Sequence, residues 1–232
     1  MIEFIFMLTH SDRTVPNARA VYDEIRDCDL RYVGFKDIGL PIEELQALSA
    51  AIRADGRQVM LEVVSEAEED ELRSIRAALE IGVDWLLGGT HPREALEILD
   101  GNDRIHYCPF PGRVIGHPSL LRGTIDEIAD DADRLTSMPG VHGLDLLAYR
   151  FDGDVEALAA AVQERAHGPV IAAGSVDSLE RIAALNRIGV WGFTIGGAIF
   201  DGKFAGAPSV PAQIDAVLEA AAVPPVSGGT SA

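Results

Sequence analysis

Short apolar runs alternate with longer amphipathic stretches along the whole chain. The apolar runs are rich in Val, Ile, Leu, Phe and Tyr, which favours buried strands, and a helical pattern follows each run. This alternation is typical of successive βα units around a parallel sheet. Eight strands are predicted, at residues 3–8, 31–36, 58–64, 85–87, 105–109, 143–148, 170–173 and 192–195.

Eight βα units predict an α/β chain that closes into a single (β/α)8 barrel over residues 1–222. Near-continuous apolar strands such as VMLEVV and PVIAA fit this fold, because a parallel barrel with outer helices buries its strands on both faces. Helices are expected over 41–55 and 178–187, where apolar residues recur at helical spacing. Gly56 and Gly189 follow these helices as stop signals.

Two segments fall outside the βα pattern. Residues 109–123 contain three prolines and three glycines and form the longest stretch predicted to lack structure; loops of this length are often functional lids. Arg113, His117 and Arg122 in this loop could close over an anionic substrate, although surface solubility explains them equally well. Residues 223–232 are rich in Pro, Gly and Ser and are expected to be a disordered tail.

The composition limits the classes of partner that the chain is expected to bind. The formal net charge of -18 repels polyanions, so nucleic acid and anionic membrane surfaces are not expected partners. No apolar run reaches the roughly 18 residues of a spanning helix, and the first residues lack the features of a signal peptide, which favours a cytoplasmic location. The two cysteines are too few for a disulfide framework. The sequence is compatible with a homo-oligomer as well as with a monomer.

The last two predicted strands are followed by glycine turns, AAGSVDS at 172–178 and TIGGAIFDG at 194–202. Phosphate commonly binds to these two loops of a (β/α)8 barrel. Glycine lets the backbone approach an oxyanion, and the backbone N–H groups that follow can donate to it. A purely structural role in tight turns is the alternative. The predicted phosphate-binding residues are Gly174, Ser175, Gly196, Gly197 and Ala198.

The segment VIAAGSVDSLERIAALNRIGVWGFTIGGAIF resembles the closing quarter of the ribulose-phosphate-binding barrels. That superfamily includes histidine-biosynthesis isomerases, aminosugar-phosphate and pentose-phosphate epimerases, and the orotidine-monophosphate decarboxylase group. The resemblance covers residues 169–200 well and the remainder only as architecture, and it implies phosphate binding at the two glycine turns. The decarboxylase group's Asp-x-Lys-x-x-Asp pattern is not met by GFKDIG at 34–39, which argues against decarboxylation.

Two charged residues lie in or at the end of neighbouring predicted strands. Lys36 is one of only two lysines in an arginine-rich chain, and its amine could act as an acid or base, a Schiff-base nucleophile or a charge clamp. A rim ion pair with Asp37 is the alternative. Glu62 interrupts an apolar strand, where an unpaired carboxylate would be costly, so Lys36 is its expected partner unless Glu62 faces the helices.

Three further residues are candidates for proton transfer. Asp145 lies in the sixth predicted strand, roughly across the barrel from Lys36, and groups on opposite sides of a bound carbon suit an epimerase or isomerase. His10 and His91 follow the first and fourth strands, and imidazole transfers protons near neutral pH, although lone histidines are often structural. The histidines and carboxylates permit a divalent metal, but HxxxH and HxH spacings are absent, so no cofactor is expected.

These residues predict a cofactor-independent isomerase or epimerase of a small sugar phosphate, in carbohydrate metabolism. Lys36, Glu62 and Asp145 would supply proton transfer and charge stabilisation. A class I aldolase or lyase, with Lys36 as the Schiff base, is the alternative reaction class. A barrel that binds a phosphorylated ligand without catalysis is a third interpretation.

Overall fold

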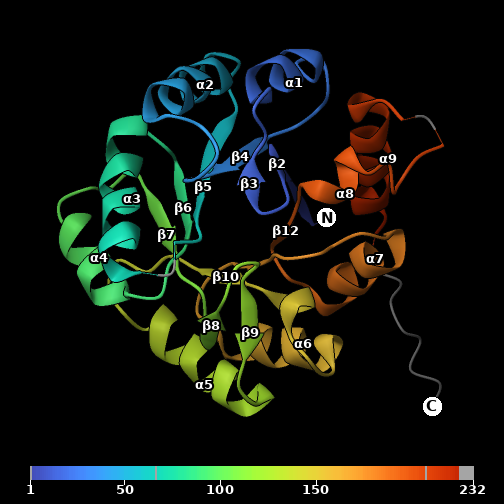
Figure 1. The fold of residues 1–232 in the computed structure, drawn as a ribbon. Coiled ribbons are helices and arrows are strands. Elements are labelled where there is room, and N and C mark those ends of the chain that lie inside the picture. The colour runs from blue at the N-terminus through green and yellow to red at the C-terminus, as the bar shows by residue number, and fades with distance from the viewer. Residues whose placement is uncertain (1, 66, 207, 225–232) are drawn as a thin grey trace, which may run out of the picture.

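The computed structural model describes residues 2–65, 67–206 and 208–224, and in them eight parallel strands form a nearly closed cylinder inside a ring of helices (Figure 1). This confirms the predicted (β/α)8 barrel. Residues 225–232, most of the predicted tail, lie outside the described residues. The barrel strands are β1 (Glu3–Met7), β4 (Tyr32–Lys36), β5 (Gln58–Val63), β6 (Trp85–Gly88), β7 (His106–Cys108), β10 (Leu144–Leu146), β11 (Val170–Ala172) and β12 (Gly192–Ile195).

A helix follows each barrel strand and covers the outside of the cylinder (Figure 1). Both helices singled out from the sequence are present as α2 and α7, and Gly189 ends α7 in the left-handed conformation, with φ at 86°. None of the helices in the described ranges combines the length and apolar character needed to cross a bilayer. The helices are α1 (Ala18–Glu24), α2 (Ile42–Ala54), α3 (Glu68–Ile81), α4 (Pro92–Ile98), α5 (Ile125–Thr136), the 3-10 helix η1 (Ala148–Arg150), α6 (Val155–Arg165), α7 (Leu179–Ile188), α8 (Gly197–Phe200) and α9 (Val210–Ala222).

Two β-hairpins project from the carboxyl ends of barrel strands. The first pairs β2 (Thr9–His10) with β3 (Arg13–Thr14), and the second pairs β8 (Arg113–Ile115) with β9 (Leu120–Arg122). The second hairpin corrects the expectation that 109–123 lacks structure. Its prolines and glycines flank two short strands and form their connecting turn, and Leu121 is fully buried, which anchors β9.

The amino-terminal end of the barrel is closed by aromatic rings. Trp85 and Tyr32 begin their strands, and Trp191 immediately precedes β12. Trp85 stacks on Trp191 with ring centroids 5.0 Å apart, and on His106 at 4.5 Å. Stacked aromatic pairs contribute beyond the area that they bury. This cluster seals the end of the barrel that lies opposite the carboxyl ends of the strands.

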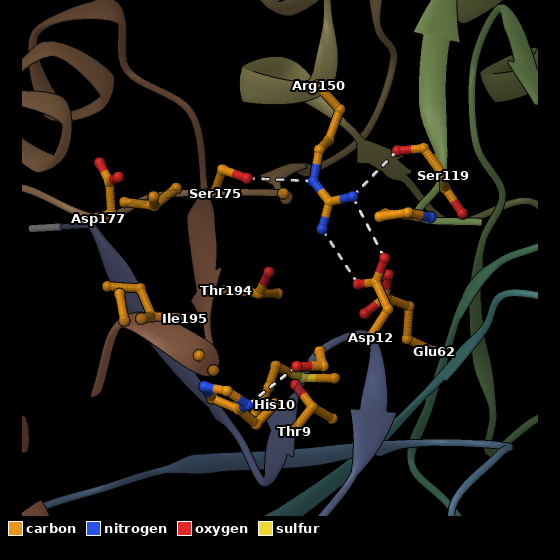
Figure 2. A pocket seen from close by; sticks show the side chains of 18 of the residues that line it. Thr9, His10, Asp12, Glu62, Ser119, Arg150, Ser175, Asp177, Thr194 and Ile195 are labelled. Carbon is orange, nitrogen blue, oxygen red and sulfur yellow. Dashed lines mark hydrogen bonds and ion pairs between the residues drawn. The ribbon is translucent and has the colours of Figure 1, made fainter. Parts of the chain in front are cut away.

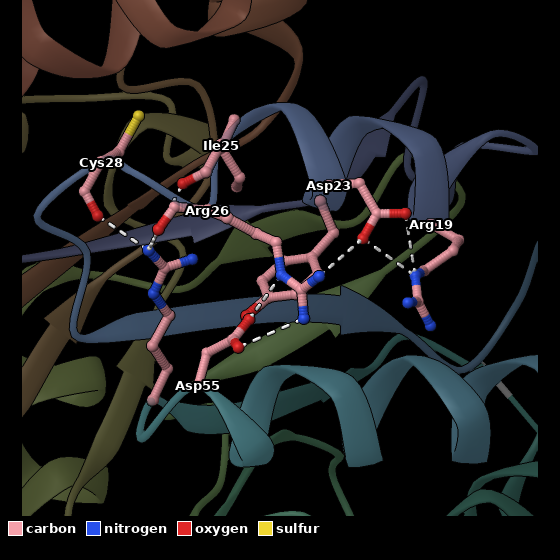
Figure 3. Close-up of polar contacts among 8 residues, drawn as sticks. Arg19, Asp23, Ile25, Arg26, Cys28 and Asp55 are labelled. Carbon is pink, nitrogen blue, oxygen red and sulfur yellow. Dashed lines mark hydrogen bonds and ion pairs between the residues drawn. The ribbon is translucent and has the colours of Figure 1, made fainter.

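Arg57, just before β5, holds the end of α1 at the outer layer. Its Nη2 donates to the carbonyl oxygens of Ile25, Arg26 and Cys28, which lie at and just beyond the end of the helix. Asp55 accepts from the side chain of Arg26 in the same cluster (Figure 3). Carbonyls at a helix end need partners from outside the helix. The guanidinium therefore fixes α1, and the chain leading into β4, against the start of β5.

The cylinder closes between β7 and β10, the two ends of the sheet order, where strand pairing is sparsest. One bridge joins Tyr107 to Val141, and the Asp145 N–H donates to the Pro109 carbonyl at 3.1 Å. Gly143 precedes β10 at this seam. A Cβ there would meet the Pro169 carbonyl, would lie 2.8 Å from Pro169 Cγ and would lie 3.2 Å from Cys108 Sγ. Position 143 therefore requires a residue without a side chain, because β10 packs closely against Pro169 on one side and Cys108 of β7 on the other.

Gly143→Ala is expected to lower the free energy of unfolding by about 1–3 kcal/mol, because the added methyl group overpacks the seam between β10 and its neighbours. Urea denaturation followed by circular dichroism measures the change. Gly206→Ala is the matched control, since a Cβ there meets no atom within 4 Å, and its effect should stay within about 0.5 kcal/mol. Equal stabilities of the two variants would show that the seam tolerates the methyl group.

Candidate active site

A cavity of about 820 Å³ opens at the carboxyl ends of the barrel strands. Its walls come from both hairpins, from the loop after β11 and from the turn between β12 and α8 (Figure 2). The carboxyl-terminal face is where (β/α)8 barrels place their reactive groups. The cavity is therefore the candidate active site.

Strand geometry places Lys36 and Glu62 inside the barrel. Tyr32 belongs to the interior cluster, and Lys36 follows it by four residues, so both side chains point to the same face of β4. Lys36 is paired in register with Glu62 of β5, and its Nζ lies 3.4 Å from Glu62 Oε1. Asp37, the alternative partner, instead accepts from the hydroxyls of Ser65 and Ser74. The structure thus brings Lys36 and Glu62 together at the cavity floor.

Asp12, in the turn between β2 and β3, is a second carboxylate on Lys36. Lys36 Nζ donates to Asp12 Oδ1 at 2.8 Å, and the side chains of Lys36, Asp12 and Glu62 are each 10% exposed or less. Burial would lower the pKa of Lys36, but the charges of Glu62 and Asp12 outweigh it and raise that pKa. Lys36 is therefore an ammonium ion at neutral pH.

Arg150, in η1 just after β10, completes a charged network. Its guanidinium donates to both carboxylate oxygens of Asp12, at 3.1 and 3.2 Å, and to the Ser175 hydroxyl at 3.1 Å (Figure 2). Burial would raise the pKa of Asp12, yet Lys36 and Arg150 together lower it. The sequence analysis singled out neither Asp12 nor Arg150, because its acidic candidates lay within apolar strands and its arginine candidates lay in the 109–123 loop. Their positions just after the first and sixth strands were the available signal.

Asp145 also faces the barrel interior, because it is in register with Ile171 of the interior cluster. It is fully buried and is absent from the cavity walls; within the described residues neither carboxylate oxygen has a hydrogen-bond partner. Burial raises its pKa well above the usual range, and the charge of Glu62 raises it further, against the opposing charge of Lys36. The surroundings of Asp145 therefore favour its protonated form beneath the site.

The two glycine turns come together in the same cavity. All five residues predicted to bind phosphate line it: Gly174, Ser175, Gly196, Gly197 and Ala198. Gly174 and Ser175 have φ values of 75° and 63°, and a Cβ on Gly196 would collide with Thr9. In the described part of the chain the Ser175 N–H makes no hydrogen bond. The turns therefore present backbone donors at one wall of the cavity.

The two candidate histidines lie in different surroundings. His10 lines the cavity and bonds to Asp201 Oδ1 through Nε2 at 3.0 Å. His91 lies outside the cavity walls, where its Nδ1 is 2.8 Å from Glu71 Oε2. Glu71 is fully buried on α3 and also accepts from the backbone N–H groups of Thr90 and His91, and its hydrogen bond raises the pKa of His91. This geometry fixes the loop before α4.

The three candidate lid residues also differ in whether they line the cavity. His117, in the turn of the β8–β9 hairpin, lines the cavity, whereas Arg113 and Arg122 pair with each other in the hairpin strands and are not among its lining residues. Over the described ranges, no group of three or more His, Cys, Asp or Glu side chains is placed to hold a metal ion.

Comparison with known proteins identifies the fold. No protein-family model and no curated protein matches the sequence. Orotidine 5'-phosphate decarboxylase from Pyrococcus horikoshii OT3 superposes with a TM-score of 0.65 at 11% identity, over 94% of this chain and 98% of that one. The enzyme of the same name from Lactobacillus acidophilus gives 0.65 at 10% identity, over 96% and 100%. The chain therefore shares the (β/α)8 fold of these two enzymes. At these identities the similarity establishes the fold and leaves the chemistry to the site.

Asp145→Asn should remove a pH dependence of folding stability. The native pKa of Asp145 is raised, so above about pH 4 this group binds more protons in the folded than in the unfolded state, and its contribution to stability falls as pH rises. The asparagine variant lacks this decline, so its advantage in free energy of unfolding should grow from pH 5 to pH 9 in urea titrations. Asp100→Asn, at an exposed position, is the control. An advantage that stays constant with pH would mean that the Asp145 carboxyl does not titrate abnormally.

Proposed function

We propose that this chain is an isomerase or epimerase acting on a small phosphorylated sugar or a related metabolite. The observation that carries the proposal is the Lys36 ammonium, held between Asp12 and Glu62 in the cavity that the two glycine turns also line. An ammonium beside a carboxylate can move a proton and stabilise the charge that results. The glycine turns offer a phosphate site beside that pair.

Glu62 is the proposed base, because Asp12 is already bound by Lys36 and Arg150. Glu62 would remove the proton from the carbon next to the substrate carbonyl, and the electron pair would move onto the carbonyl oxygen. Lys36 would donate a hydrogen bond to the resulting enediolate. An isomer forms when Glu62 returns the proton to the former carbonyl carbon while the proton of the neighbouring hydroxyl passes to the enediolate oxygen. An epimer forms when solvent delivers a proton to the opposite face of the original carbon while Glu62 keeps the first proton.

The raised pKa of Lys36 favours this reaction over a class I aldolase. A Schiff base requires the free amine, and the charges of Glu62 and Asp12 oppose loss of the proton. Borohydride trapping with a keto sugar phosphate separates the two reactions. No covalent adduct at Lys36 is expected, and an adduct there would favour the aldolase.

A decarboxylase is the second candidate. The two structural neighbours carry that name, and carboxylates flanking an ammonium could destabilise a substrate carboxylate while Lys36 protonates the carbanion left by CO₂. Carbon dioxide release from phosphorylated carboxylates measures this activity. Release without exchange of substrate protons with solvent would replace the first candidate by the second.

Lys36→Arg should lower turnover by about 10²–10⁴ while the protein stays folded, because the planar guanidinium keeps the charge but cannot place a donor where the Lys36 ammonium lies between Asp12 and Glu62. Turnover is measured as deuterium incorporation next to the carbonyl, by NMR in D₂O, across a panel of phosphorylated aldoses and ketoses. Arg104→Lys, at an exposed position, is the control and should leave exchange unchanged. Normal exchange in Lys36→Arg would remove the amine from the mechanism.

Gly197→Asp should weaken binding of inorganic phosphate by about 100-fold or more, because a carboxylate beside the glycine turn repels the anion. Gly197→Ala is the matched control: a Cβ there meets only His10 Cδ2, at 3.7 Å, so the turn should survive and affinity should change little. Isothermal titration with inorganic phosphate measures both. Equal affinities in the two variants would place the anion elsewhere.

A further inference from the structure

Arg150 nearly exhausts its hydrogen-bonding capacity on the protein. A guanidinium has five N–H donors. Nε donates to Ser175 Oγ, Nη2 to Asp12 Oδ1, and Nη1 to both Asp12 Oδ2 and the Ser119 carbonyl, at 3.1 to 3.2 Å. One N–H on Nη2 is left by these four bonds. A ligand could therefore receive one hydrogen bond from Arg150 without displacing another.

The partners of Arg150 belong to three separate segments. Asp12 lies in the β2–β3 hairpin, Ser119 in the turn of the β8–β9 hairpin, and Ser175 in the loop after β11 (Figure 2). Asp12 and Ser175 both have positive φ, at 57° and 63°, a conformation that costs a residue other than glycine of order 1–3 kcal/mol and persists where the surroundings hold it. Arg150 is part of what holds both residues.

The loop after β11 also leaves room for this side chain. Gly174 carries no Cβ, and one added there would collide with Arg150 Cγ and lie 3.3 Å from its Nε. The side chain of Arg150 crosses the loop at this point and is 20% exposed, within the cavity wall. Glycine at 174 thus serves the passage of Arg150 as well as the turn.

We propose that Arg150 is a positioning residue that couples closure of the β8–β9 hairpin to the placement of Asp12 beside Lys36. A single nitrogen, Nη1, donates to both Asp12 and Ser119, so lifting the hairpin loosens the contact that holds the carboxylate. Only one part of this inference rests on the proposed function, namely that Lys36, which Asp12 contacts, takes part in the reaction. The coupling itself is a property of the free protein.

Coupling of this kind acts in both directions. The charged groups facing Asp12 are Lys36 from β4 and Arg150 from η1, and Glu62 of β5 acts on it through Lys36. Removing Arg150 takes a cation from Asp12, so the Asp12 carboxyl should titrate at higher pH. Removing the charge of Asp12 takes from Arg150 its anionic partner and should loosen the hairpin.

Carbon-13 NMR of protein labelled at the aspartate carboxyl groups tests the first direction, with the Asp12 signal assigned by its loss in Asp12→Asn. Asp12 is expected to titrate at higher pH in Arg150→Met than in the parent protein, and between the two in Arg150→Lys, which keeps the charge. Amide hydrogen exchange tests the second direction. Exchange of the β8 and β9 amides should accelerate at least about tenfold in Arg150→Met, and also in Asp12→Asn.

Arg181→Met is the matched control, because Arg181 also holds the loop after β11, through the Ser175 carbonyl, but does not contact Asp12 or the hairpin. It should change neither readout. The proposal is overturned if Asp12 titrates in Arg150→Met at the same pH as in the parent protein, or if hairpin exchange is unchanged in Asp12→Asn. Should Arg150→Met not fold, Arg150→Lys and Asp12→Asn supply both readouts. Neither measurement uses a substrate, so failure of the isomerase proposal would leave this result standing.

Discussion

A buried ammonium held between two carboxylates is the interaction on which the site depends. Removing either carboxylate would leave a charge without compensation in a poorly solvated interior, which is strongly destabilising. Lys36 therefore requires both Glu62, its register partner, and Asp12, which only the β2–β3 hairpin can supply. Asp12 in turn needs Arg150. The charge at one strand end thus determines how two hairpins and a loop must lie.

The aromatic residues that stabilise the barrel and the charged residues of the candidate site lie at opposite ends of its axis. Strand β4 begins at Tyr32 in the aromatic cluster and ends at Lys36 in the cavity, and the two-residue alternation of the strand points both side chains inward. Asp145 lies between these layers, where burial and the charge of Glu62 raise its pKa, because an ionised carboxylate would add a third negative charge below Lys36. The interior therefore changes from apolar to charged within one strand length, as barrels with a reactive carboxyl-terminal face require.

The apolar pattern predicted the eight strands, their order and the glycine stops, because each of these is written in local sequence. It also placed Lys36 and Glu62 on neighbouring strands. It could not find Asp12 and Arg150, which are 138 residues apart and meet only when the barrel closes. Nor could it separate His91 from the cavity, because the partner that holds it, Glu71, comes from α3. The local sequence pattern predicts secondary-structure elements, whereas contacts between distant side chains depend on how the barrel closes.

The aromatic cluster at the amino-terminal end has a spectroscopic consequence. The chain contains two tryptophans, Trp85 and Trp191, and they stack on each other at the end of the cylinder opposite the cavity. All tryptophan emission of this protein therefore arises from one coupled pair of indoles. That emission reports whether the cylinder is closed at its base, and a ligand at the far end has no indole of its own to quench.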